Sequence, residues 1–162
     1  MSDLRLRDRL QPALLDRLTD DKDTSGAPRS MSMRDLRRCV RRDLESLLNT
    51  VNLESVEDLA DFPHVASSVV NYGVPGLSGR TLSTLRPEGV AMLIRQAILR
   101  FEPRLSQVRV VPEIHKDQAD ARGLSFRIEA ELWGNPLPQH MELRTMVDVD
   151  SRQIAVADIG GA

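Results

Sequence analysis

The sequence contains little cysteine and no pattern of metal ligands. Cys39 is the one cysteine among 162 residues, so no internal disulfide can form. It lies among apolar positions of a predicted helix, and we expect a small buried thiol, as in a protein of the reducing cytoplasm. The three histidines, His64, His115 and His140, lack the spacing of metal ligands. Neither a metal centre nor a cofactor is therefore expected.

Aromatic residues and long apolar runs are also scarce. Aromatic residues make up 3% of the chain, and Trp133 and Tyr72 are its single indole and its single phenol. Sites that bind single-stranded nucleic acid usually stack bases on aromatic side chains. No apolar run reaches the roughly 18 residues of a membrane helix, and the first residues lack the apolar stretch of a signal peptide. We therefore expect a cytoplasmic protein that does not insert into a membrane.

The basic residues are almost all arginine. The chain has 22 Lys+Arg against 24 Asp+Glu, a formal net charge of -2, and only Lys22 and Lys116 are lysines. Such a balance provides no overall field that would attract nucleic acid or a membrane surface. Arginine suits interfaces because its planar guanidinium binds carboxylates in a bidentate manner, although a biased genome composition would give the same preference.

The first thirty residues differ from the rest and are expected to form a charged N-terminal arm (1–30). Leu10, Leu14, Leu15 and Leu18 fall at helical spacing, and the polar stretch 19–28 that follows is typical of a linker. The short amphipathic helix either folds back on the domain or docks on a partner. Residues 31–162 are expected to form a single domain.

The apolar periodicity predicts helices first and strands afterwards. One helix is expected over 31–50 and a second from Pro87 to Phe101, where Pro103 prevents its continuation. Alternating patterns then predict strands over 107–115, 124–133, 140–150 and 153–159. Short connections make neighbouring strands antiparallel. We therefore predict an α+β fold with N-terminal helices packed on one face of a C-terminal antiparallel β-meander of three to four strands.

One helix face and several carboxylates are candidates for function. Five arginines gather on a second face of the first helix: Arg34, Arg37, Arg38, Arg41 and Arg42. They form either a site for phosphate or an acidic partner, or an ordinary solvated face, and the lack of interleaved aromatic residues favours the latter over nucleic acid. No nucleophile elbow, zinc-protease or dinucleotide motif is present. A peptidoglycan hydrolase with two paired acids remains an alternative, but we predict no catalytic residue.

The tripeptide Glu102-Pro103-Arg104 lies where the second helix ends. Pro103 forces the chain out of the helix and favours an extended backbone at Glu102. The acid and the base are thus expected to be displayed at a rigid corner between helix and sheet. The plainer alternative is a helix end with two surface charges.

At this tripeptide the chain resembles a known family. Five segments carry the likeness in order: LLDRLTDD at 14–21, VRRDLESLLNT at 40–50, SVVNYGVPGLSG at 68–79, FEPRL at 101–105 and LRTMVD at 143–148. Together they resemble the TssE family, the type VI secretion baseplate subunit that is similar to the small wedge protein of contractile phage tails.

The resemblance implies a structural, non-enzymatic protein. In that family the Glu-Pro-Arg motif lies at an assembly contact of the baseplate wedge, which corresponds here to Glu102, Pro103 and Arg104. The implied partners are the larger wedge subunits TssF and TssG and the contractile sheath of TssB and TssC. The implied location is the cytoplasm, in a baseplate docked at the inner membrane complex.

Overall fold

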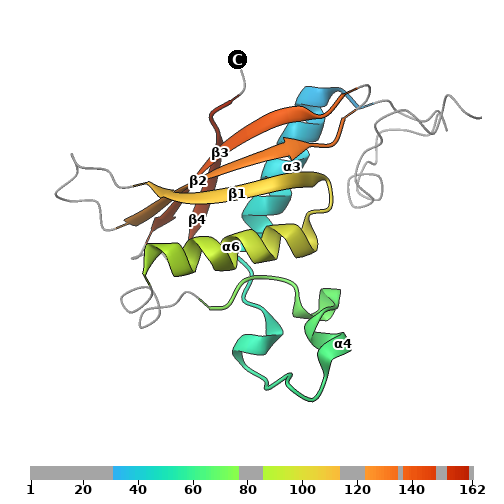
Figure 1. The fold of residues 1–162 in the computed structure, drawn as a ribbon, viewed down its shortest axis with the longest axis vertical. Helices are drawn as coiled ribbons and strands as arrows, with labels where there is room; N and C mark the ends of the chain where they lie inside the picture. Colours follow the sequence, from blue (N-terminus) through green and yellow to red (C-terminus); the bar gives the residue numbers. More distant parts are fainter. Residues whose placement is uncertain (1–30, 77–85, 114–122, 135–136, 149–152, 161–162) are drawn as a thin grey trace, which may run out of the picture.

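The computed structural model describes residues 31–76, 86–113, 123–134, 137–148 and 153–160 (Figure 1). The predicted N-terminal arm lies outside these residues. Two long helices, α3 (Met33–Leu48) and α6 (Pro87–Phe101), precede a four-stranded sheet. The strands are β1 (Leu105–Glu113), β2 (Gly123–Leu132), β3 (Gln139–Asp148) and β4 (Ile154–Asp158).

Both helices begin at residues that favour a helix start. The Ser32 side chain caps α3 by accepting a hydrogen bond from the backbone N–H of Asp35 at 3.1 Å. Pro87 occupies the first turn of α6, where its missing N–H costs no helical hydrogen bond. The apolar face of α3 is buried along its length, through Leu36, Val40, Leu44, Leu47 and Leu48. Cys39, expected to be buried, is only half-buried, since it lies beside this face and not on it.

The sheet is an antiparallel meander in the order β1-β2-β3-β4, which confirms the predicted α+β fold. The two helices pack on the sheet, with α6 along β1 and α3 beside β4 (Figure 1). Alternate residues of β2 and β3 point into this core, which includes Phe126, Ile128, Leu132, Met141 and Leu143. The remaining residues of each strand face away from the helices.

The first strand begins two residues earlier than the sequence predicts. Its pairing with β2 starts at Leu105 and shifts register between Ser106 and Arg109. Gln107 has a φ of 52°, a left-handed conformation that is typical of a β-bulge. The bulge interrupts the alternation of apolar and polar residues. Residues 105–106, which precede it, therefore could not be recognised from the sequence as part of the strand. The predicted ends at 114–115 and 149–150 lie outside the described residues.

The segment between the helices forms a small lobe, defined here as residues 51–72. It contains two 3₁₀ turns, η1 (Leu53–Ser55) and η2 (Val69–Asn71), and the short helix α4 (Pro63–Ala66). In Figure 1 the lobe extends beyond α6, away from the sheet. A parallel bridge between Val51 and Val74 closes its neck. The lobe therefore projects from the domain as a separate piece of surface.

A charged cluster joins three strands on the sheet face opposite the helices. Glu113 of β1 accepts hydrogen bonds from Arg127 Nε at 2.7 Å and from Arg144 Nε at 2.8 Å. Burial by itself raises the pKa of the Glu113 carboxyl, but hydrogen bonds and Coulombic attraction from the two arginines outweigh it and lower that pKa. Asp158 shows the same balance, because its contacts with Arg37 outweigh the effect of burial and its pKa is also lowered.

These two carboxyl groups predict how stability depends on pH. Because their pKa values in the folded protein lie below the unfolded values of about 4, they stabilise the fold above that range. Their contribution is lost as the pH falls through the lowered pKa values. Urea midpoints measured from pH 7 to pH 3 should fall, and Glu113→Gln should flatten that dependence. The exposed Glu57 provides a control; an equal flattening by Glu57→Gln would contradict the assignment.

Candidate functional site

The Glu102-Pro103-Arg104 corner connects α6 to β1, as predicted, but its acid is not displayed. The Glu102 side chain is 4% exposed, whereas Arg104 is 26% exposed and Pro103 lies at the surface. The chain leaves the helix at Glu102, which has φ -122° and ψ 76°, and the carboxylate lies against Arg104 and away from solvent. The expectation of two displayed charges was therefore wrong for Glu102.

Three charged side chains form a compact network at this corner. The guanidinium of Arg104 donates from Nε to Glu102 Oε1 at 2.6 Å and from Nη2 to Glu102 Oε2, a bidentate pair. Its Nη2 also donates to Asp43 Oδ2 of α3 at 2.6 Å. The backbone N–H of Arg104 adds a bond to Glu102 Oε1 at 3.2 Å. The network ties the end of α6 and the start of β1 to α3.

The charge state of Arg104 follows from this setting. Burial of the guanidinium disfavours its charged form, but the hydrogen bonds and Coulombic attraction of Glu102 and Asp43 more than compensate. The pKa of Arg104 is therefore raised above its ordinary value. The group is a permanent cation that holds two carboxylates and has no proton to exchange near neutral pH.

An open pocket of about 390 Å³ lies beside the network, lined by Asp43, Leu47, Tyr72, Phe101, Glu102, Pro103 and Arg104. The rings of Tyr72 and Phe101 meet edge to face, with their centroids 5.3 Å apart. The Tyr72 hydroxyl donates to the backbone carbonyl of Asp43 at 3.5 Å. Burial raises the pKa of this hydroxyl, and the negative charges of Asp43 and Glu102 add to the effect. The pocket thus combines an apolar wall with a charged rim.

Asp43 and Tyr72 are members of this site that were not predicted from the sequence. Each lies within a segment that carries the family resemblance, but nothing local indicates that they approach Arg104, which is 61 residues from Asp43. One signal was available: at about 100° per residue, Asp43 falls beside the apolar face of α3 and away from the arginines. An acid next to a buried face is a candidate partner for a distant arginine.

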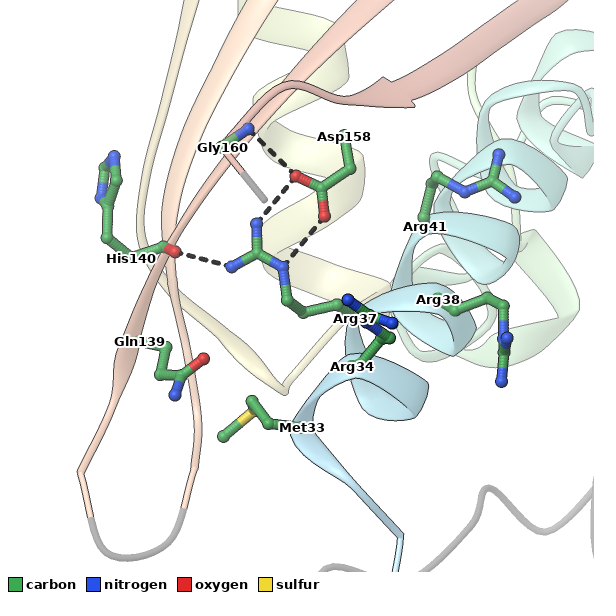
Figure 2. Close-up of a pocket in the computed structure, with 9 residues that line it drawn as sticks. All are labelled: Met33, Arg34, Arg37, Arg38, Arg41, Gln139, His140, Asp158 and Gly160. Carbon is green, nitrogen blue, oxygen red and sulfur yellow. Dashed lines mark hydrogen bonds and ion pairs between the residues drawn. The ribbon is translucent and has the colours of Figure 1, made fainter. Parts of the chain in front are cut away.

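Of the predicted stripe of five arginines on α3, two bind strand β4 and three are exposed. Arg37 points toward the sheet and binds Asp158 in a bidentate manner, with Nη2–Oδ1 at 2.7 Å and Nε–Oδ2 at 2.9 Å (Figure 2). Arg41 donates to the carbonyl of Val156 at 3.1 Å. Arg34, Arg38 and Arg42 are exposed. The stripe is therefore not one continuous free surface for nucleic acid.

Two of these contacts, with a third from Asn49, close the outer edge of β4. The Asn49 amide donates to the carbonyl of Ile154 and accepts from its N–H, both at 2.8 Å. Asn49 and Arg41 thus pair with backbone groups of Ile154 and Val156 from the side of α3, while Arg37 holds the side chain of Asp158. Covering an edge in this way prevents unwanted pairing with another strand. The same arginines line an open pocket of about 650 Å³ between α3 and the sheet (Figure 2).

The described residues offer little for catalysis. A general acid needs a raised carboxyl pKa, whereas the carboxyl pKa values shifted by their surroundings, those of Asp35, Glu113 and Asp158, are all lowered. Within these ranges no group of three or more His, Cys, Asp or Glu side chains is arranged to hold a metal ion. His64 and His140 are exposed, and His115 lies outside the described residues.

None of the described helices is both long and apolar enough to cross a bilayer.

Comparison with known proteins connects this fold to an assembly. No curated protein and no solved structure matches the chain significantly. Residues 34–137, well over half of the chain, match the family described as baseplate wedge protein gp25. The matched range contains all of α3 but its first residue, the lobe, α6 and the Glu102-Pro103-Arg104 corner. The chain therefore belongs to the baseplate wedge protein gp25 family and is a structural component of a baseplate wedge.

Proposed function

We propose that this chain is the TssE subunit of a type VI secretion baseplate. In this role it joins the larger wedge subunits TssF and TssG and helps to start assembly of the contractile sheath of TssB and TssC. It acts in the cytoplasm, in a baseplate docked at the inner membrane complex. The membership in the baseplate wedge family supports the general role, and the five ordered sequence segments support the specific one.

One observation carries the proposal most strongly. Three of the five segments are far apart in the chain and yet meet at one pocket: Asp43 comes from 40–50, Tyr72 from 68–79, and Glu102 and Arg104 from 101–105. A surface built from three of these segments is the expected place for a contact that the family shares. We therefore assign the docking contact to the corner of Glu102, Pro103 and Arg104.

The three residues have different tasks in this contact. Glu102 is buried and positions Arg104, whose guanidinium is already held by two carboxylates before any partner arrives. Such preorganisation lowers the ordering cost of binding. Pro103 is exposed and lies at the rim of the pocket, so it is the residue that a partner touches directly.

Co-purification at native expression level tests this proposal. We expect the tagged protein from its own bacterium to recover two larger wedge proteins in near-stoichiometric amounts, with sheath proteins in trace. Pro103→Ser should reduce that recovery several-fold, because it alters the rim and leaves the ion network in place. Pro138 is also exposed but lies near the start of β3, so Pro138→Ser is the matched control.

Two results would contradict the proposal. Recovery of the wild-type chain without any larger partner would contradict the proposed contact with larger wedge subunits in that bacterium. Clearing of purified cell-wall sacculi by the chain, lost on replacing one of two neighbouring acids, would instead support a peptidoglycan hydrolase.

A further inference from the structure

The lobe exposes more apolar surface than its size explains. Twelve large apolar side chains are exposed within the described residues, and five of them lie in the lobe: Val51, Val56, Phe62, Val69 and Val70. Val69 is 80% exposed and Val56 is 73% exposed, whereas Leu59 is the one buried large apolar residue of the lobe. Apolar side chains gathered on one projecting segment are characteristic of a surface that another segment covers.

The lobe also has a charge of one sign. Glu54, Glu57, Asp58 and Asp61 are all exposed, and no lysine or arginine occurs between residues 43 and 79. The formal charge of the lobe is therefore -4. A segment that covers it should combine apolar side chains with positive charge, because oppositely charged surfaces attract and like charges exclude wrong partners.

The lobe is a preformed surface and not a loose loop. The side chain of Asn71 is buried; its Oδ1 accepts from the backbone N–H of Glu54 at 2.9 Å and its Nδ2 donates to the carbonyl of Ala66 at 3.0 Å. Asn71 thereby connects η1, α4 and η2. A surface held in this way requires little reorganisation to bind a ligand segment.

We propose that residues 4–18 of the N-terminal arm dock on the lobe of the same chain. This segment has the required chemistry: it contains six leucines, and four arginines against two aspartates give it a formal charge of +2. Leu10, Leu14, Leu15 and Leu18 follow the spacing of one helix face. The leucines cover the exposed valines and Phe62, and the arginines face the four acids.

The connecting chain is long enough for this contact. Residue 31 lies at the N-terminal end of α3 and the lobe follows its C-terminal end (Figure 1). A helix of 16 residues is about 24 Å long. The 13 peptide steps from Leu18 to Met31 span up to about 43 Å when extended. The linker can therefore span the length of α3 and bring the arm to the start of the lobe.

A spin label on the arm of the full-length chain tests the proposal. The label is attached to Thr19→Cys in a Cys39→Ser background, which changes none of the leucines or charges of the arm. We expect the nitroxide to broaden the amide NMR signals of residues 51–72 selectively, Val69 and Val70 included. Mixing labelled chains with separate isotope-enriched chains should give no such broadening, because the contact lies within one chain.

Matched variants identify the two surfaces. Val69→Ser with Val70→Ser should abolish the broadening, and so should Leu14→Ser with Leu15→Ser. Met92→Ser with Leu99→Ser removes two similarly exposed apolar residues of α6 and should leave the broadening unchanged. Uniform broadening, or broadening centred outside the lobe, would overturn the proposal. Broadening in the mixed sample would also overturn it, since a second copy would then occupy the lobe.

Discussion

Replacing Arg104 by alanine should lower the free energy of unfolding by about 3 kcal/mol. The reason is the Glu102 carboxylate, which is 4% exposed and loses its bidentate partner. A buried charge without a partner costs far more than the ion pair itself contributes. Urea denaturation at pH 7, monitored by circular dichroism, measures the effect.

Two further variants show whether the unpaired charge is the cause. Glu102→Met with Arg104→Met removes both charges and should be less destabilising than Arg104→Ala alone. Arg38 offers a comparison on the same protein, since its side chain is 68% exposed and pairs with Asp35 three residues away. Arg38→Ala should cost under about 1 kcal/mol. If Arg104→Ala were equally mild, Glu102 would not depend on Arg104 for its burial.

This result also affects how assembly experiments are interpreted. A loss of wedge assembly in Arg104→Ala could arise from a weakened fold as well as from a lost contact. Pro103 is exposed and takes no part in the ion network. Pro103→Ser is therefore the variant that separates docking from stability.

Gly73→Ala should be about as destabilising as Arg104→Ala, but for a steric reason. Gly73 has a φ of +123°, and a Cβ atom at this position would lie 2.4 Å from the carbonyl oxygen of Thr50. That carbonyl accepts from the N–H of Val74 at 2.9 Å in the neck of the lobe, so it cannot move away without breaking the neck. Backbone strain of this kind costs up to about 3 kcal/mol, and we expect Tm to fall by about 10 °C.

Gly160 provides the matched control for this substitution. A Cβ atom there would lie 3.2 Å from Glu142 Cβ, at an exposed end of the chain, and its φ is not in the left-handed region. Gly160→Ala should therefore shift Tm by only a few degrees. A Gly73→Ala protein as stable as the wild type would show that the neck can open without affecting the domain.

Much of the secondary structure could be predicted from local pattern. The second helix has the predicted bounds of Pro87 and Phe101, and the first runs over Met33–Leu48 within the predicted 31–50. Helical and strand periodicities are properties of neighbouring residues, so they are visible in the sequence. Even so, the bulge at Gln107 was missed, because its positive φ leaves no apolar pattern.

In the candidate site, too, some features could be predicted from the sequence and others could not. The sequence alone determined that a helix ends at Glu102-Pro103-Arg104, because the ring of Pro103 is incompatible with a helix interior. Only the tertiary structure decided that Glu102 is buried, that Asp43 completes the network from α3, and that Arg37 pairs with Asp158, 121 residues away. These contacts depend on how the helices cross the sheet, and packing of that kind is a property of the whole chain that no local pattern of residues records.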